Sequence, residues 1–513
     1  MPESIVLSGG PLRIDQVVAV AEHGASVTVD PGLPDRMAPA ARMVERVVEE
    51  GRTVYGVTTG FGALASTKID PGRADDLQWQ LLRSHAAGVG DPLPDQHVRA
   101  MLLLRARSLS QGYSGVRPIV VERLLDLLRL GLLPVVPSQG SVGASGDLAP
   151  FAHLALPQVG EGEVRVDGVV RPAAEALAEH DLEPLRLRAK EGLSLLNGTE
   201  GMLAFGVLGL HRACRLAKAA DLACALSVEG LLASERPFQS RLHEVRPHPG
   251  QLASAENIRR LLAGSEIVAS HQHDFEHAVQ DAYSLRCAPQ VHGSARDVFS
   301  HAESVFTIEL GSVVDNPIVF PEDDEIVSGG NFHGQPLAFA MDFMAIAATE
   351  LGSISERRTD RMLDPHHSSG LPPFLSPEAG LHSGYMLAQY TAAALVAENR
   401  VLAHPASVES IPTSGSQEDH VSMGFGAGRK LWDVLENTAR VLAIELVCAA
   451  QAIDFRMPAR PGAATAAVHE AIRQRIPHLG ADRVLSAEIE TVAGMVRDGS
   501  LVAVAEGIVG ELL

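Results

Sequence analysis

The chain has 513 residues, of which 46% are hydrophobic and only 4% aromatic, so its core has to be built mainly from Leu, Ala and Val. This composition favours helices over a β-sandwich, which would be richer in Tyr, Phe and Ile. With 42 basic and 63 acidic residues, the formal net charge is −21, which argues against nucleic acid or an anionic membrane as a partner.

Cysteine usage and the N-terminus indicate the compartment. The four cysteines form no CxxC pair, so they are typical of buried thiols in a reducing environment. The N-terminus lacks the charged and then apolar pattern of a signal peptide, and the apolar runs are shorter than a membrane span. We therefore expect a cytoplasmic protein.

The first 198 residues mix short strands with helices, and we expect them to form a smaller N-terminal lobe. Pro118 suits a first helical turn, and Gly131 with Pro134 ends that helix. An Asp-Gly pair at 167 and 168 predicts a hairpin turn. The predicted elements are a strand over 5–7, helices over 14–23 and 118–128, an irregular loop over 134–150 and a β-hairpin over 163–170.

Residues 199–513 have a different pattern, dominated by long helical stretches. In the last stretch, apolar residues recur on one helical face, and they are Leu435, Leu442, Leu446, Ala449 and Ile453. Long helices of this kind pack into bundles and usually bury further apolar surface by oligomerising. The predicted helices cover 200–233, 335–353, 382–402 and 423–455.

The segment from Gly143 to Pro150 contains three small residues, Ala144-Ser145-Gly146, whose backbone could react. If a tight turn brings the nitrogen of Gly146 onto the carbonyl carbon of Ala144, a five-membered ring can close, because glycine tolerates the unusual φ. Loss of two waters, one involving the Ser145 hydroxyl, then leaves a methylidene-imidazolone, which is an electrophile.

Two other interpretations of this segment are weaker. A nucleophile elbow, G-x-S-x-G, needs glycine at position 147, where the chain has Asp147. A phosphate cradle lacks the Gly-Lys-Ser/Thr that should follow, and Asp147 would repel phosphate.

Two segments before this turn carry further candidates. Thr53 to Gly62 places three glycines around Tyr55, which fits either a turn with a packed ring or a general base on a closing loop whose phenol pKa the site must lower. Arg83 to Gly88 contains His85, which fits either a structural histidine near a helix end or a ligand-binding one.

Four segments after the turn also carry polar candidates. Asn197 opens the first long helix and could be only a cap. In the segment 280–290, Arg286 offers a forked guanidinium suited to a carboxylate, or a structural ion pair. The remaining two segments are Asn331-Phe332-His333-Gly334 and Ser416 to Met423.

A metal site is a further alternative. His273 and His277 are spaced i and i+4, which would place them on one face of a helix. No cysteine is adjacent, so a solvated helix start is the better interpretation and we expect no metal.

Taken together and in this order, the segments resemble those of the aromatic amino-acid ammonia-lyases and aminomutases. The flanks of the Ala-Ser-Gly run, from Gln139 to Pro150, resemble the cofactor-forming segment of that family. The resemblance spans Tyr55 to Glu418, and it implies that 4-methylidene-imidazol-5-one forms from Ala144, Ser145 and Gly146 without an external cofactor.

The resemblance also implies roles for individual residues. Tyr55 would remove the β-proton, Asn197 would bond the prosthetic ring and the substrate, and Tyr283 would lie beside that ring. The implied catalytic residues are Tyr55, Ala144, Ser145, Gly146, Asn197 and Tyr283. The implied substrate-binding residues are His85, Asn197, Gln280, Arg286, Phe332 and Glu418.

Ser84-His85 and Glu418 resemble the histidine-selective branch, because both side chains can hydrogen-bond an imidazole. Thr58 and Glu200 depart from the pattern of that branch. The implied reaction is non-oxidative deamination of L-histidine to trans-urocanate and ammonia, the first step of histidine degradation. The alternatives are a tyrosine or phenylalanine ammonia-lyase, an aromatic 2,3-aminomutase, a non-catalytic paralogue and a metal-dependent lyase.

The resemblance finally implies an architecture. The expected fold is mainly α, with a long central antiparallel helical bundle like that of fumarase and aspartase and a smaller mixed N-terminal lobe carrying short strands. A homotetramer whose active sites combine residues from more than one subunit is expected.

Overall fold

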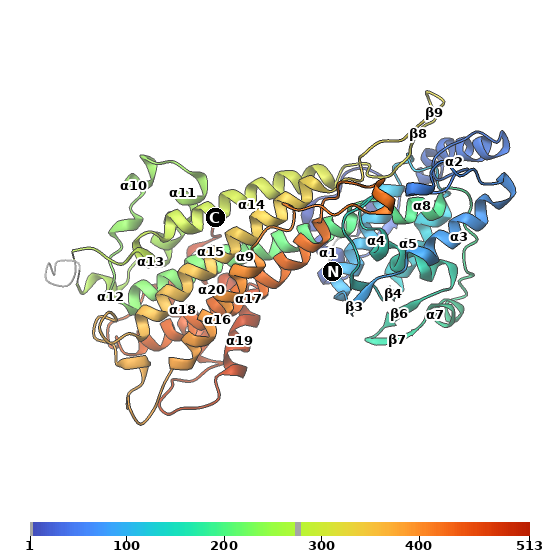
Figure 1. Ribbon diagram of the computed structural model, residues 1–513. Helices are drawn as coiled ribbons and strands as arrows, with labels where there is room; N and C mark the ends of the chain where they lie inside the picture. The colour runs from blue at the N-terminus through green and yellow to red at the C-terminus, as the bar shows by residue number, and fades with distance from the viewer. Residues whose placement is uncertain (1–3, 272–278) are drawn as a thin grey trace. The chain divides into compact units, whose positions relative to one another are not determined.

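The computed structural model describes residues 4–271 and 279–513 and is mainly helical, as predicted (Figure 1). The chain forms two compact units. The first contains residues 1–208, 303–341 and 406–429, and the second contains residues 209–302, 342–405 and 430–513. Four long helices contribute residues to both units: α9 (Glu200–Gly230), α14 (Ala288–Glu309), α15 (Gln335–Leu363) and α17 (Gly424–Asp454).

The first unit combines helices with short strands. Its helices are α1 (Ile14–His23), α2 (Leu33–Glu49), α3 (Ala74–His85), α4 (Asp95–Leu109), α5 (Pro118–Arg129), α6 (Leu148–Ala155), α7 (Ala173–Glu179) and α8 (Glu191–Leu196). Its strands are β1 (Ile5–Leu7), β2 (Val27–Val29), β3 (Val89–Pro92), β4 (Leu133–Pro134), β5 (Pro137–Gln139), β6 (Glu163–Val166), β7 (Val169–Pro172), β8 (Ile318–Phe320) and β9 (Glu325–Val327).

The strands form small sheets at the edges of this unit. Strands β1 and β2 pair in parallel, whereas β3 with β5 and β8 with β9 are antiparallel pairs. The largest sheet has the order β4-β6-β7 and is antiparallel. The β6–β7 turn places both Asp167 and Gly168 at positive φ, 48° and 81°, as a two-residue type I′ hairpin requires.

Helix α4 lies at the centre of the first unit. Its residues from Val98 to Leu109 are buried, apart from Arg99, and they include the guanidinium-bearing Arg105 and Arg107. Fully buried charges need partners. Arg105 bonds the carbonyl oxygen of Asn197, directly after α8, where the candidate site lies. Arg107 bonds the carbonyl oxygens of Gly10 and Ser312.

The second unit is built almost entirely from helices. In addition to its parts of the four long helices, it contains α10 (Ser240–Glu244), α11 (Pro249–Leu261), α12 (Glu266–Ala269), α13 (Tyr283–Arg286), α16 (Met386–Leu402), α18 (Ala463–Arg473), α19 (Ser486–Arg497) and α20 (Ser500–Val509).

Contacts between side chains fix the directions of the long helices. Helix α14 runs antiparallel to α9 and α15, and α16 runs antiparallel to α15 and α17, whereas α9, α15 and α17 share one direction. The pairs that show this are His292 with Asp221 and Arg358, Phe306 with Gly206, His301 with Phe343, Arg212 with Glu436, Ser227 with Glu445, Lys430 with Asp342, Arg358 with Glu445, Gln389 with Glu356, and Asn399 with Gly352 and Thr438. The predicted bundle with antiparallel neighbours is confirmed.

Most predicted elements agree with the structure within a few residues, including the strand at 5–7 and the helices at 14–23, 118–128 and 200–233. The exception is α15, which extends past the predicted end at 353 to Leu363. The predicted boundary between residues 198 and 199 falls just before α9 and stays a prediction.

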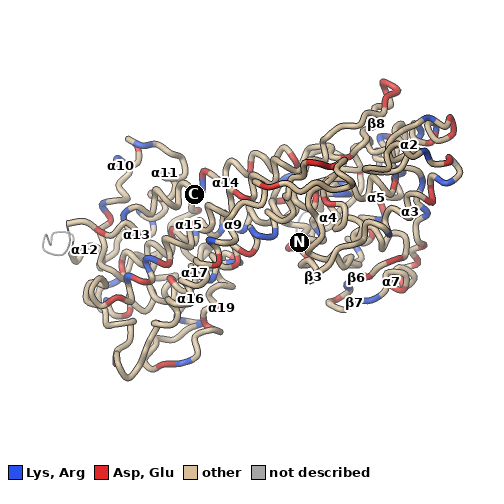
Figure 2. The backbone as a smooth tube through the Cα atoms, viewed as in Figure 1, with Lys and Arg blue, Asp and Glu red and all other residues tan. Residues whose placement is uncertain are grey.

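Within the described residues, only α15 is long and apolar enough to cross a membrane. However, 72% of its most apolar window is buried inside the protein, as in the core helix of a folded bundle. Acidic and basic residues are spread along the chain, and a short acidic segment at 322–325 lies at the β8–β9 turn (Figure 2).

Candidate active site

The Ala-Ser-Gly segment forms a strained turn between β5 and α6. Three of its residues have positive φ: Gly143 at 81°, Ser145 at 51° and Gly146 at 79°. Such a φ is uncommon for a residue with a side chain, and at Ser145 it stores about 1 kcal/mol or more of strain. The sequence therefore folds this segment into a compact turn at the point where the predicted cyclisation would occur.

Backbone contacts with residue 198 hold the turn in place. The N–H of Asp147 donates to the carbonyl oxygen of Gly198 at 2.8 Å, and the N–H of Gly198 donates to that of Ser145 at 3.3 Å. A Cβ added to Gly146 would lie 2.0 Å from the Gly198 oxygen. Only glycine fits at position 146, because any side chain there would collide with the backbone of Gly198.

Asp147 anchors the turn to the start of α9. Its carboxyl group is fully buried and accepts hydrogen bonds from the Ser141 hydroxyl at 3.1 Å and from the Met202 N–H at 2.7 Å. Burial raises the pKa of Asp147 to about 7, although both hydrogen bonds act in the opposite direction. Sequence analysis treated Asp147 only as a flanking residue and missed this anchoring role.

Ser145 faces a small cavity in the first unit. The cavity is small, with a volume of about 30 Å³. The cavity is lined by Tyr55, Phe61, Gly62, Leu81, His85, Ser145, Leu148, Leu193, Leu196, Asn197, Asn316 and Glu418.

Tyr55 belongs to the loop between α2 and α3 that covers this cavity. Its hydroxyl accepts a hydrogen bond from the Gly62 N–H at 3.2 Å, and its ring meets Phe61 edge to face. Burial raises the pKa of the Tyr55 phenol, and the negative charge of Glu418 raises it further, whereas the Gly62 contact lowers it. The lowered pKa that a general base needs is therefore not present in the single chain.

Thr58 stabilises the same loop from inside. Its buried hydroxyl donates to the Arg52 carbonyl at 2.6 Å and accepts from the Val54 N–H at 2.9 Å. Thr58 is not among the residues that line the cavity. Thr58, which departs from the pattern of the histidine-selective branch, therefore stabilises the fold of the loop and does not contact the cavity directly.

His85 and Glu418 both offer hydrogen-bond acceptors to the cavity. The Nδ1 of His85 lies 3.0 Å from the Leu81 carbonyl and 3.1 Å from the Ser84 hydroxyl, and donation from Nδ1 to the carbonyl leaves Nε2 as an acceptor. Burial lowers the pKa of His85, although the Leu81 carbonyl and Glu418 oppose the shift. Glu418 accepts from the Thr413 hydroxyl at 2.9 Å.

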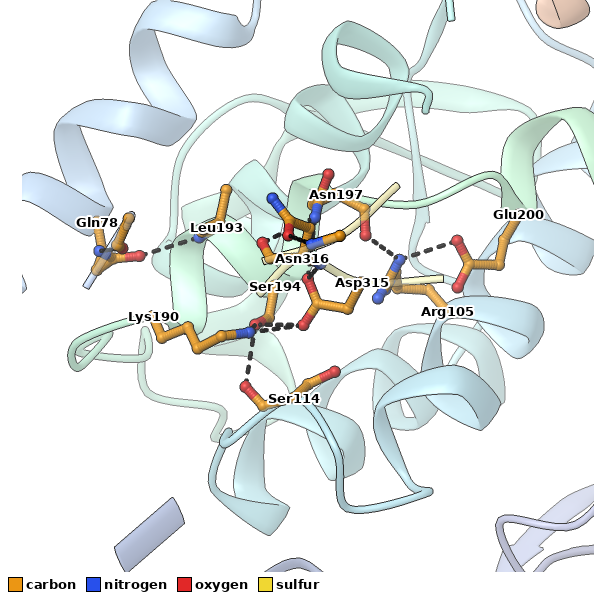
Figure 3. Close-up of polar contacts among 12 residues, drawn as sticks. Gln78, Arg105, Ser114, Lys190, Leu193, Ser194, Asn197, Glu200, Asp315 and Asn316 are labelled. Carbon is orange, nitrogen blue, oxygen red and sulfur yellow. Dashed lines mark hydrogen bonds and ion pairs between the residues drawn. The ribbon is translucent and has the colours of Figure 1, made fainter. Parts of the chain in front are cut away.

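Asn197 ends α8 and is held at both its backbone and its side chain (Figure 3). Its carbonyl oxygen accepts from Nη1 of Arg105 at 2.9 Å, and the same Arg105 atom lies 2.8 Å from Glu200. Glu200, which departs from the histidine-selective pattern, thus forms a buried ion pair that supports the residue beside the reactive turn.

Two distant motifs also reach the turn. The N–H of Met423 donates to the Val142 carbonyl at 2.9 Å, which docks the segment 416–423 onto the residues before Ala144. His333 stacks on His420 with ring centroids 5.8 Å apart, which joins the segment 331–334 to the same region. Phe332 is half-buried beside His333 but is not among the cavity-lining residues.

The other predicted residues belong to the second unit. Arg286 stacks over the Tyr283 ring at 4.4 Å, and its Nε donates to the Asp281 carbonyl. Tyr283 is 70% exposed, and Gln280 is also exposed. His273 and His277 lie outside the described residues. In the part of the chain that the structure does describe, no cluster of three potential metal ligands occurs.

The structure thus collects Tyr55, His85, Ser145, Asn197 and Glu418 around one cavity. Sequence analysis missed its apolar wall, which consists of Phe61, Leu81, Leu148, Leu193 and Leu196. It also missed Asn316, which stands in an Asp-Asn-Pro run at 315–317 that is typical of a turn. No sequence pattern distinguishes the residues of this apolar wall from ordinary core residues, since only the fold brings them together.

Comparisons with known proteins agree with this geometry. A model of the family described as aromatic amino acid lyase matches residues 12–474. A histidine ammonia-lyase of Gloeobacter violaceus is 53% identical over 99% of this chain and 98% of its own length. A histidine ammonia-lyase of Deinococcus radiodurans is 52% identical over 96% of this chain and 94% of its own.

Solved structures show the same fold. A tyrosine aminomutase from Streptomyces globisporus superposes with a TM-score of 0.93 at 41% identity, covering 98% of each chain. A histidine ammonia-lyase from Trypanosoma cruzi has a TM-score of 0.90 at 41% identity, covering 98% of this chain and 95% of that one.

Together with the full-length relatives, the helical fold that carries a strained Ala-Ser-Gly turn beside a small, partly apolar cavity identifies the class of this protein as a carbon–nitrogen lyase. The family match and the full-length relatives specify it further. The chain belongs to the aromatic amino acid lyase family.

Proposed function

We propose that the protein deaminates L-histidine to trans-urocanate and ammonia. The observation that carries this proposal is that His85 and Glu418 present acceptors to the cavity that contains Ser145. An imidazole N–H can donate to either acceptor, whereas a phenyl ring has no N–H to offer, and an acceptor that is buried without a partner costs about 1–3 kcal/mol. Relatives named histidine ammonia-lyase are 53% and 52% identical to this chain, which supports the same substrate.

A substrate panel tests this proposal directly. The unmodified protein is incubated with L-histidine, L-phenylalanine and L-tyrosine, and the conjugated product is followed by its ultraviolet absorbance. Histidine should be converted with the highest kcat/KM. Equal turnover of phenylalanine or tyrosine would contradict the assignment to histidine.

Residues 144–146 are proposed to form a methylidene-imidazolone by cyclisation of their own backbone. Ring closure joins the Gly146 nitrogen to the Ala144 carbonyl carbon, and two waters leave. The tight turn, with positive φ at both Ser145 and Gly146, supports this chemistry. The group supplies an electrophile, which the ordinary side chains do not provide.

Peptide mass spectrometry checks the cyclisation. The peptide that contains residues 144–146 should lack the mass of two waters. Ser145→Ala should remove this deficit and most of the activity while leaving the melting temperature close to that of the parent. A full-mass peptide in active enzyme would overturn the proposal.

Tyr55 is proposed as the base that removes the β-proton, with Arg286 holding the substrate carboxylate. In the single chain the phenol pKa is raised, so the base role requires a positive charge near the ring in the working site. Arg286 belongs to the second unit, and we propose that it supplies this charge from a neighbouring subunit.

A homotetramer with shared active sites would meet this requirement. Large apolar side chains on α15 and α16 are well exposed in the single chain, which is typical of surfaces that bury against another subunit. Four of them are Ile346 at 44%, Leu387 at 56%, Tyr390 at 58% and Val401 at 75% exposure.

The proposed location is the cytoplasm.

An aromatic 2,3-aminomutase is the second candidate, because the tyrosine aminomutase from Streptomyces globisporus has the same fold at 41% identity. This activity would return the ammonia to the β-carbon. Chromatography of the reaction products separates the two reactions, since only the aminomutase yields a β-amino acid.

A further inference from the structure

The side-chain amide of Asn197 has a fixed orientation. Its Nδ2 donates to Oδ1 of Asp315 at 3.1 Å and to the carbonyl oxygen of Asn316 at 3.0 Å (Figure 3). Both partners are oxygens that accept, so the position between them has to be filled by the NH₂ group. Both hydrogens of the NH₂ group are therefore engaged by Asp315 and Asn316. Of the side-chain amide atoms, Oδ1 remains available to bind a group in the cavity that Asn197 lines.

Asp315 determines both of these contacts. Its Oδ1 also accepts from the Asn316 N–H at 2.7 Å, which places the Asn316 carbonyl against Asn197. Its Oδ2 accepts from the Ser194 hydroxyl at 3.0 Å and from Nζ of Lys190 at 2.8 Å. The carboxylate of Asp315 is thus fully hydrogen-bonded, and one of its acceptor atoms always faces Asn197.

Lys190 balances the charge of Asp315. Both side chains are completely buried, and Lys190 sits at positive φ, 70°, immediately before α8. Burial alone would raise the pKa of Asp315, but the charges of Lys190 and Arg105 outweigh it and hold the pKa below its ordinary value. The ionised carboxylate is therefore the state that contacts Asn197.

We propose that Asp315, held by Lys190, is a positioning residue that orients Asn197 so that its amide oxygen accepts a hydrogen bond from the amino group of the substrate. The proposal rests on the proposed deamination, because it concerns the same cavity. In this arrangement Asn197 acts toward the substrate as an acceptor, since its donors are already engaged. Asp315 itself acts only through Asn197.

The test compares two double variants that both remove the buried charges: Lys190→Met/Asp315→Asn and Lys190→Met/Asp315→Leu. Asn, Leu and Asp have similar shapes, but only Asn keeps an oxygen that can accept from Asn197. The kcat of the Leu variant should be at least about 10-fold lower than that of the Asn variant. The two melting temperatures should agree closely, and both proteins should show the two-water mass deficit.

A double-mutant cycle then separates positioning from general damage. Asn197→Ala is added to both double variants, and the difference in kcat between them should shrink to less than roughly twofold. A purely structural effect of Asp315 would persist at full size without Asn197. Equal kcat of the two original variants, an undiminished difference in the Asn197→Ala background, or a Leu variant without the mass deficit would overturn the proposal.

Glu191→Gln serves as the matched control. Glu191 is buried next to Lys190, and its carboxylate bonds Arg117 and the Arg188 N–H. The variant should lower the melting temperature and leave kcat unchanged, and a loss of kcat as large as that of the Leu variant would contradict the proposal. The cycle uses whichever amino acid the unmodified chain deaminates, so a failure of histidine as substrate is recognised separately.

Discussion

We propose that substrate choice in this pocket depends on two residues, His85 and Glu418, and on the hydrogen-bonding groups that they keep available. The Leu81 carbonyl engages Nδ1 of His85, which leaves Nε2 as an acceptor, and Glu418 contributes carboxylate oxygens. Neither atom can be satisfied by a phenyl ring. L-Histidine should therefore be preferred over L-phenylalanine by at least about 100-fold in kcat/KM.

Two substitutions test this preference. His85→Leu should lower kcat/KM for histidine and raise it for phenylalanine, because the wall becomes apolar. Glu418→Gln should weaken histidine turnover more than any turnover of phenylalanine. Steady-state kinetics on both substrates provide the measurement, and an unchanged ratio in the His85→Leu protein would show that another residue selects the ring.

Asp147 makes the stability of the protein depend on pH. Its pKa is about 7 in the folded chain and 3.8 when unperturbed, so folding favours the protonated form. The resulting stabilisation is complete below about pH 4 and is lost as the pH rises to about 7. Between pH 5.5 and pH 8, this residue alone should reduce the free energy of unfolding by about 1–2 kcal/mol.

Asp147→Asn isolates this effect. The amide oxygen can still accept from the Met202 N–H, and the Ser141 hydroxyl can rotate to accept from the NH₂ group. Unfolding is followed at both pH values for the parent and the variant. The parent should lose more stability than the variant as the pH rises, and parallel losses would exclude Asp147 as the titrating group.

At the scale of whole elements, the sequence predicts helices well where apolar periodicity and end signals coincide. Pro118 and Gly131 bracket α5, and the apolar face from Leu435 to Ile453 identifies α17. The end of α15 was predicted ten residues or so too early, because the run from Glu356 to Arg361 has the charge of an exposed segment.

The structure explains this error through long-range pairing. Arg358 and Glu356 are buried, and Arg358 forms an ion pair with Glu445 of α17. No local pattern reveals a partner 87 residues away. The same limit applies to the site: its motifs were visible in the sequence, but the contact of Lys190 with Asp315 and the apolar wall exist only in the folded chain.

The Arg358–Glu445 pair predicts how strongly α15 and α17 depend on each other. Arg358→Met removes the guanidinium from the buried Glu445 carboxylate, to which the Ser227 hydroxyl still donates. Removing one partner of a buried ion pair costs about 3–5 kcal/mol. The melting temperature should fall clearly in Arg358→Met and recover partly in Arg358→Met/Glu445→Gln, which calorimetry can measure. A double variant less stable than the single one would contradict this assignment.

At the scale of the whole molecule, the predicted site residues are divided between two units. Tyr55, His85, Ser145, Asn197 and Glu418 line one cavity, whereas Gln280, Tyr283 and Arg286 belong to the other unit. Tyr283 is 70% exposed in the single chain, and the proposed shared site would bury it against another subunit. This division leads to a prediction about mixed assemblies.

Tyr55→Phe and Arg286→Met should each be inactive alone. The first variant lacks the proposed base, and the second lacks the guanidinium proposed to bind the substrate carboxylate. If a site takes Tyr55 and Arg286 from different subunits, random co-assembly of equal amounts rebuilds roughly a quarter of the sites with both native residues. Co-expressed chains carrying two affinity tags are purified over both tags and assayed with histidine. The doubly tagged enzyme should have close to that fraction of the activity of the unmodified enzyme, since every chain still carries either a native Tyr55 or a native Arg286. If both residues of a site came from the same chain, no mixed tetramer would contain a native site, and the doubly tagged enzyme would stay as inactive as its parents.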